Sequence, residues 1–253
     1  MAVSASHDLD LFFRNPIFAT FSAENREKLR SSITVREFFA GEVIVRAGSK
    51  FAFVGVLTSG MIISQRGKAE EGTLRLLLPM DMVGRPDRTR SSYELRVIAN
   101  AKMCLLPVSC CITFLNQNPA AAIPFLSSTV GMIGQGREWI WIAYHREAFQ
   151  KVCLFLCYII HTYRRADLLS EGGPWVIPFP ITRSEIGSFL GLGLHTVSRQ
   201  LNTLKDQGVI SYMIGRSLTI LDLGALCQLA GMSGPSPLTS SWSERNFMTM
   251  VEF

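Results

Sequence analysis

The stretch ITRSEIGSFLGLGLHTVSRQLNTLKDQGVI, residues 181–210, carries the signals of two helices joined by a short turn. Thr182 followed three residues later by Glu185 is a capping box, in which each side chain binds a free main-chain N–H where a helix begins. Gly191 suits the left-handed conformation that ends a helix. We therefore expect the first helix over residues 183–190.

A second helix is expected over about residues 194–207, with Gly193 as its N-terminal cap. Gly187 has no side chain, so this second helix can cross close above it. One side of the second helix is apolar and should face a core; it holds Val197, Leu201 and Leu204. The opposite side carries short hydrogen-bonding groups and one arginine, namely His195, Ser198, Arg199 and Asn202.

Residues 208–221, GVISYMIGRSLTIL, predict two short strands around a Gly-Arg-Ser turn, a wing beside the helix pair. Two helices, a short turn and a following hairpin are typical of a winged helix-turn-helix, whose second helix enters the major groove of DNA. Arginine can form two hydrogen bonds with guanine, and serine can reach a base edge or a phosphate. The alternative is an ordinary helical hairpin with a polar outer face.

Residues 35–106 alternate short apolar runs with glycines, which predicts a compact roll of antiparallel strands. The glycines supply positive φ angles at its corners, and they are Gly41, Gly48, Gly60, Gly72 and Gly84. We place this β-roll, a sensor-like domain, at residues 16–118.

The pattern changes to a helical one over residues 119–165. Pro119 and Pro124 suit the first turn of a helix. A heptad seam follows, which packs either on its own domain or on a second copy of the chain, and we favour the second copy. The predicted dimer-interface residues of this seam are Leu126, Val130, Ile133, Arg137, Ile140 and Tyr144. A further, strongly apolar helix is expected over about residues 147–165.

The remaining boundaries follow from composition. Residues 171–180, EGGPWVIPFP, hold two glycines and three prolines and are expected to form a linker. Residues 166–231 form the winged helix-turn-helix domain, and residues 232–253, without periodicity, a flexible tail. The expected fold class is α+β: an antiparallel roll, a long helix and a C-terminal winged helix-turn-helix.

Composition narrows the class of protein. The apolar run over residues 152–160 is about half of what a membrane-spanning helix needs. No basic start followed by an apolar core marks a secretory signal, and six cysteines without framework spacing indicate reduced thiols in the cytoplasm. No hydrolase triad, carboxylate pair or dinucleotide fingerprint indicates an enzyme. The net charge of +5 mildly favours an acidic partner.

The helix-turn-helix stretch resembles, without a gap, the DNA-reading element of the CRP/FNR family of bacterial transcription regulators. FAGEVIVRAG, FVGVLTSG and DMVGRP resemble the family's roll, and REWIWIAYHREAFQKVCLFL its dimer helix running into the next one. The resemblance covers about residues 16–231 and is strongest to the FNR/FixK-like side.

The resemblance implies a homodimer that binds a near-palindromic site on double-stranded DNA. Ser198 and Arg199 match residues that read the half-site, and His195 stands where the family usually has a base-contacting glutamate. Thr182 and Arg183 match phosphate contacts, and Lys205 and Arg216 are further phosphate candidates, equally compatible with solvated surface.

The sensing residues depart from the family. Iron–sulphur members use a cluster of N-terminal cysteines plus one in the roll, and here only Cys104 matches, at the roll position. Cyclic-nucleotide members carry a glutamate and an Arg-Ser pair that this chain lacks. We expect neither cofactor. A candidate effector loop holds Gly84, Arg85, Arg88 and Arg90, although such runs of charge usually form solvated surface.

The other cysteines are expected to be structural. Cys153, Cys157 and His161 repeat every four residues, which would suit a metal site, but their apolar surroundings favour core packing. Cys110 and Cys111 would form a redox switch only if one were exposed with a lowered pKa.

Three functional hypotheses remain. The first is a DNA-binding regulator without a ligand, which would contact RNA polymerase if it activates transcription. The second is a degenerate paralogue that heterodimerises with a related regulator and blocks it. The third is a regulator that senses a small anion in the roll.

Overall fold

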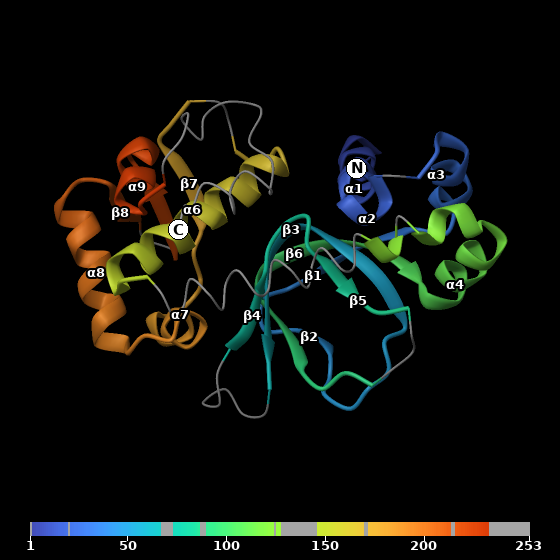
Figure 1. Ribbon diagram of the computed structural model, residues 1–253, viewed down its shortest axis with the longest axis horizontal. Helices are drawn as coiled ribbons and strands as arrows, with labels where there is room; N and C mark the ends of the chain where they lie inside the picture. The colour runs from blue at the N-terminus through green and yellow to red at the C-terminus, as the bar shows by residue number, and fades with distance from the viewer. Residues whose placement is uncertain are drawn as a thin grey trace. The chain divides into compact units, whose positions relative to one another are not determined.

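The computed structural model combines helices with antiparallel strands, the α+β class that the sequence predicts (Figure 1). It describes residues 2–19, 21–66, 73–86, 90–123, 125–127, 146–169, 172–213 and 216–232. The chain divides into two compact units, residues 1–133 and 134–253. Each unit has its own core, so each is described by itself.

The first unit is built on a sheet in the order β1-β6-β3-β4, with β2 paired to β6 and β5 paired to β3. All of these pairings are antiparallel, so the predicted roll is confirmed. The strands are β1 (Thr34–Phe38), β2 (Val43–Val45), β3 (Phe53–Gln65), β4 (Thr73–Leu77), β5 (Met82–Gly84) and β6 (Glu94–Pro107). The two long strands, β3 and β6, pair with each other and form the centre of the sheet.

The glycines do more than turn corners. Gly41 and Gly48, in the turns on either side of β2, and Gly84, at the end of β5, have positive φ as expected, whereas Gly60 has φ of 91° inside β3. The register between β3 and β6 shifts on both sides of Gly60, so this residue forms an irregularity within the long strand. A Cβ at Gly60 would meet the main chain at Asn100 and Ala101. Gly72 lies outside the described residues.

Alternating residues of β3 and β6 serve two apolar clusters. One, inside the roll, consists of Phe38, Val45, Phe51, Leu57, Ile62, Leu77, Val83, Leu95, Val97, Ala101 and Met103. The other joins Val54, Val56, Cys104 and Leu106 to the helix that follows Asn118 and to four further helices. These four helices, grouped at one end of the sheet in Figure 1, are α1 (Ala2–Arg14), α2 (Pro16–Ala19), α3 (Ala23–Arg30) and α4 (Val108–Gln117). The sequence did not predict α1, which places Phe12 and Phe13 in this second cluster.

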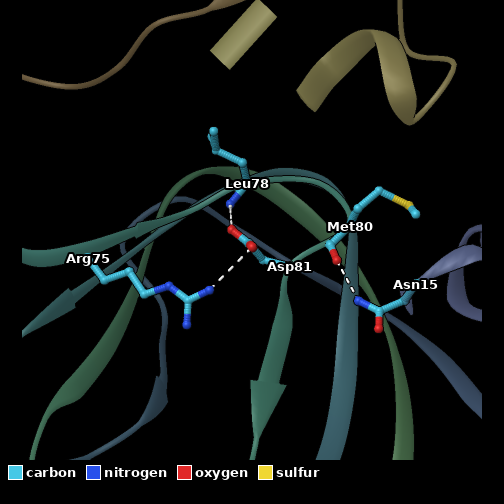
Figure 2. A network of polar contacts seen from close by, with 5 residues as sticks. All are labelled: Asn15, Arg75, Leu78, Met80 and Asp81. Carbon is cyan, nitrogen blue, oxygen red and sulfur yellow. Dashed lines mark hydrogen bonds and ion pairs between the residues drawn. The ribbon is translucent and has the colours of Figure 1, made fainter. Parts of the chain in front are cut away.

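A small polar network attaches the N-terminal helices to the roll (Figure 2). The amide of Asn15, between α1 and α2, donates to the carbonyl of Met80 at 2.6 Å, and its Oδ1 accepts from the N–H of Ile17. Asp81 accepts from the N–H of Leu78 at 2.8 Å and pairs with Arg75 at 3.3 Å. These contacts hold the turn between β4 and β5, where Met80 has φ of 76°.

The helix predicted after residue 118 begins at Pro119, and residues 119–123 and 125–127 are helical. Ile123 and Leu126 are 72% and 64% exposed on it. Pro124 and five seam residues lie outside the described residues: Val130, Ile133, Arg137, Ile140 and Tyr144. No helix among the described residues is long and apolar enough to cross a membrane.

The second unit surrounds α6 (Ala148–Arg165), which confirms the apolar helix predicted there and packs against α8 and α9. The other elements are β7 (Trp175–Pro178), α7 (Arg183–Leu190), α8 (Leu194–Asp206), β8 (Ile210–Met213), β9 (Ser217–Ile220) and α9 (Leu223–Leu229). The strands form an antiparallel sheet in the order β7-β9-β8.

The prediction that residues 171–180 form only a linker is wrong for residues 175–178. Trp175 and Ile177 are buried and alternate with exposed Val176 and Pro178, so this segment forms strand β7. Because β7 is an edge strand, its proline removes no hydrogen bond that a second neighbour would need.

Candidate nucleic-acid interface

The start of α7 is fixed by the predicted capping box. The N–H of Glu185 donates to Oγ1 of Thr182 at 3.1 Å, and the N–H of Thr182 donates to Oε2 of Glu185 at 2.8 Å. The Thr182 hydroxyl also donates to that carboxylate at 2.9 Å. The helix ends at Gly191 in the left-handed conformation, with φ of 65° and ψ of 38°. Both ends of the predicted first helix are therefore confirmed.

The turn between α7 and α8 depends on Gly187. The N–H of Leu192 donates to the carbonyl of Gly187 at 2.8 Å, and a Cβ on Gly187 would collide with the carbonyl of Leu192. The turn itself, rather than the body of the second helix, makes the close approach that the sequence suggested. Gly193 caps α8 as predicted, without a side-chain hydrogen bond.

The two faces of α8 are as predicted. Val197, Leu201 and Leu204 are fully buried. Among the polar residues, Ser198 is half-buried, whereas His195, Arg199 and Asn202 are exposed. The first two turns of α8 thus present an imidazole, a hydroxyl and a guanidinium away from the core. These groups can donate to or accept from base edges.

Leu194 is a surface residue that the sequence did not identify. It falls three and seven residues before Val197 and Leu201, so by spacing it belongs to the apolar core stripe. It is nevertheless 49% exposed, because α8 begins at this residue. Its position at the start of the second helix could have indicated this exposure, since recognition helices contact base edges with their N-terminal residues.

The residues predicted to contact DNA phosphates are all exposed, but their side chains differ in their hydrogen bonds and in the element that carries them. The Thr182 hydroxyl is committed to Glu185, so capping is its role in this structure. Arg183 lies in the first turn of α7, and Lys205 in the last turn of α8. Arg216 precedes β9 in the wing with φ of 59°. Arg183, Lys205 and Arg216 present cations from three separate elements of the helix-turn-helix and its wing.

The candidate effector loop is partly bound to its own roll. Gly84 ends β5 with φ of 94°, Arg85 is exposed, and Arg90 donates to the carbonyl of Gly48 at 2.7 Å. Arg88 lies outside the described residues.

The residues do not fit a four-cysteine iron–sulphur cluster. The thiol of Cys104 is fully buried and contacts the carbonyl of Asp8 in α1 at 3.2 Å. Burial raises its pKa to about 12, which disfavours the thiolate that a metal requires. Within the described ranges, no three His, Cys, Asp or Glu residues are placed to hold a metal ion.

For the remaining cysteines and His161 that the sequence singled out, the structure favours core packing over a metal site. Cys111 is buried, and this burial raises its pKa to about 11, while Cys110 is half-buried. Cys153, Cys157 and His161 are buried in α6. Burial lowers the pKa of His161 to about 3, with a contribution from Arg165 and Arg164, so the imidazole is neutral.

Comparison with known proteins agrees with this geometry. The family model of the Crp-like helix-turn-helix domain matches residues 150–229. The chain is 30% identical over 199 residues to the transcriptional activator protein FnrL of Cereibacter sphaeroides, covering 78% of this chain and 80% of FnrL. It is 26% identical to the nitrogen fixation regulation protein FixK of Bradyrhizobium diazoefficiens, covering 57% and 59% of the two chains. Among solved structures, FixK2 from Bradyrhizobium japonicum superimposes with a TM-score of 0.65 at 21% identity, covering 80% of this chain and 99% of FixK2.

Proposed function

The chain belongs to the CRP/FNR family of transcription regulators, on its FNR/FixK side, and from that premise we propose that it acts as a homodimer on near-palindromic double-stranded DNA. Its relatives are regulators and not enzymes. The observation that carries the proposal is the exposed polar face of α8, held on a capped helix-turn-helix. Two-fold symmetry places the half-sites about one helical turn, roughly 10 bp, apart.

The base-reading residues of the proposal are His195, Ser198 and Arg199. Arg199 is exposed and can form two hydrogen bonds with one guanine. Ser198 lies beside it, half-buried, where a hydroxyl can reach a base edge or a phosphate. His195 replaces an acceptor-only glutamate by a group that can donate or accept. We therefore expect an operator that departs from the usual half-site at the base pair under His195.

The phosphate contacts come from the helix-turn-helix and the wing. Arg183, Lys205 and Arg216 are exposed and supply the positive charge that positions the domain on the duplex. Thr182 contributes by capping α7, and its hydroxyl would have to turn away from Glu185 to reach a phosphate. These contacts give affinity without sequence preference.

The dimer is supported by the helix that follows Asn118. Ile123 and Leu126 lie three residues apart on it, both largely exposed in the single chain, while Ala121 and Phe125 are buried in their own unit. This leaves an apolar face that a second copy can cover, and Ile123 extends the predicted seam by one position toward the N-terminus.

The regulator works without cyclic AMP and without an iron–sulphur cluster in this proposal. The buried thiol of Cys104 supports the absence of the cluster, and the lack of the family's glutamate and Arg-Ser pair supports the absence of cyclic AMP. Its activity then follows its abundance in the cytoplasm, where bacterial DNA lies. Because several relatives bear the name of activators, we include a contact with RNA polymerase.

Selection from a randomised duplex library tests the proposal. The protein is purified in air without added ligand, its mass in solution is measured by light scattering, and binders are selected near physiological salt. We expect a dimer and an enriched palindrome. A folded dimer that enriches no sequence would refute constitutive DNA reading and favour heterodimerisation with a related regulator. Enrichment that requires an added small anion would favour the effector loop instead.

A further inference from the structure

Two thiols from different helices meet in the core of the second unit. Sγ of Cys157, in α6, lies 3.6 Å from Sγ of Cys227, in α9. Both residues are almost completely buried, with exposures of 1% and 4%. Cys153 lies one turn before Cys157 on the same helix and is also buried. The two facing thiols are 70 positions apart in the sequence, and the helix-turn-helix, α7 and α8, lies between them.

We propose that Cys157 and Cys227 are a redox modification site that forms an intramolecular disulfide when the protein meets a hydroperoxide. A disulfide bond is about 2.0 Å long, so the two sulfur atoms need to approach by only about 1.6 Å from their positions in the reduced protein. The two helices already pack against each other, so the approach requires no rearrangement of the domain.

The reaction balances with the hydroperoxide as the sole oxidant. One thiolate attacks the peroxide oxygen, the O–O bond breaks, and an alcohol or water leaves while the sulfur becomes a sulfenic acid. The second thiolate then attacks this sulfur, the S–OH bond breaks, and water leaves as the S–S bond forms. The two sulfur atoms lose two electrons in total, and the peroxide gains them.

Burial sets the rate and the order of these steps. Desolvation raises the pKa of Cys157 well above its usual value, so its thiolate is scarce in the closed domain. Cys227 lies on α9, a helix of seven residues that follows the wing. A helix of seven residues opens more easily than α6, which has 18 residues and is buried over most of its length. Cys227 therefore reacts first, during opening, and Cys157 resolves the sulfenic acid when α9 returns.

The consequence concerns the DNA-reading domain. A bond between α6 and α9 closes a loop that contains α7, α8 and the wing, and a closed loop restricts the unfolded chain. Oxidation should therefore raise the melting temperature of the second unit. Formation of the disulfide also prevents further oxidation of either sulfur to sulfinic or sulfonic acid.

Peptide mapping of the full-length protein tests the site. The reduced protein is exposed to hydrogen peroxide, free thiols are alkylated, and tryptic peptides are analysed by mass spectrometry without reduction. Trypsin places Cys227 in residues 217–245 and both Cys153 and Cys157 in residues 152–164. We expect these two peptides to be joined, with a mass equal to their sum less two hydrogen atoms, plus one alkyl group on the third cysteine. A fully alkylated Cys227 after oxidation of half-buried Cys110 would overturn the proposal.

Alanine variants identify the partner, with Cys153→Ala as the matched control on the same helix. The linked peptides should persist in Cys153→Ala and disappear in Cys157→Ala and Cys227→Ala. The peroxide-induced rise in melting temperature should follow the same pattern. If the link persists in Cys157→Ala and is lost in Cys153→Ala, the assignment to Cys157 is wrong. If a variant does not fold, fragmentation of the linked peptide from the unchanged protein shows which of Cys153 and Cys157 carries the alkyl group and therefore which of them is bonded to Cys227.

Discussion

The side-chain amide of Asn15 donates a hydrogen bond of 2.6 Å to the main-chain carbonyl of Met80, 65 residues further along the chain (Figure 2). Both residues are buried, and Met80 adopts a positive φ that side chains other than glycine rarely occupy. The same Asn15 side chain accepts from the N–H of Ile17 at the start of α2. One amide therefore connects the N-terminal helices to the turn that closes β4 onto β5.

Replacement of Asn15 by alanine should destabilise the first unit by about 1–3 kcal/mol, because it leaves the buried Met80 carbonyl without its donor. The measurement is the melting transition of the full-length variant by calorimetry. Asn100→Ala is the control, since that side chain accepts a hydrogen bond from Ala40 at the exposed surface. If the two variants lose the same free energy of unfolding, the buried hydrogen bond of Asn15 stabilises the first unit no more than the exposed hydrogen bond of Asn100.

The helix-turn-helix was predictable in detail because its signals are local. The capping box, Gly191 and the stripe of Val197, Leu201 and Leu204 each act over a few residues, and the structure agrees with all of them. The outward face of α8 followed from the same periodicity. Leu194 was missed because spacing alone assigns it to the buried stripe.

The parts that escaped prediction depend on contacts far along the chain. The buried side of α1 is defined by strands β3 and β6, which come 40 residues or more later. Strand β7 lies among prolines and glycines and forms because β9 pairs with it. The approach of Cys157 to Cys227 spans 70 residues, and no local spacing in the sequence relates these two cysteines.

His161 should make the stability of the second unit depend on pH. Its pKa is about 3 in the folded protein and about 6.5 when exposed, so the unfolded state takes up a proton first as the pH falls. Stability is therefore complete above pH 7 and decreases through the window below 6.5, by about 2 kcal/mol between pH 7 and pH 5.

Tryptophan fluorescence can follow this unfolding, because all four tryptophans lie in residues 134–253. His161→Gln, which cannot take up a proton, should flatten the dependence over that range. A variant that loses as much stability as the wild type between pH 7 and pH 5 would exclude His161 as its source.

Arg199 and Lys205 should affect DNA binding in different ways. Arg199→Ala should cost about 1–3 kcal/mol of discrimination at one guanine position, since the exposed guanidinium reads a base edge in our proposal. Lys205→Ala should weaken binding to all DNA sequences about equally. It should also reduce the slope of the logarithm of the binding constant against the logarithm of the salt concentration by about 1. Binding constants for the selected operator and its single-base variants at several salt concentrations separate the two. Intact sequence preference in Arg199→Ala would mean that the outward face of α8 is wrongly assigned.

Leu194 should contribute specificity through an apolar contact with a thymine methyl group. It is half exposed in the first turn of α8, next to His195, where it can meet the major-groove edge of a base. Replacing the contacted thymine by uracil removes only that methyl group, at a cost of about 1 kcal/mol, or roughly fivefold in Kd. Leu194→Ala should bind the thymine and uracil operators equally, with an unchanged melting temperature. Operators with uracil at each thymine position in turn, titrated with both proteins, make the measurement. If the wild-type protein and Leu194→Ala respond identically at every position, Leu194 makes no such contact.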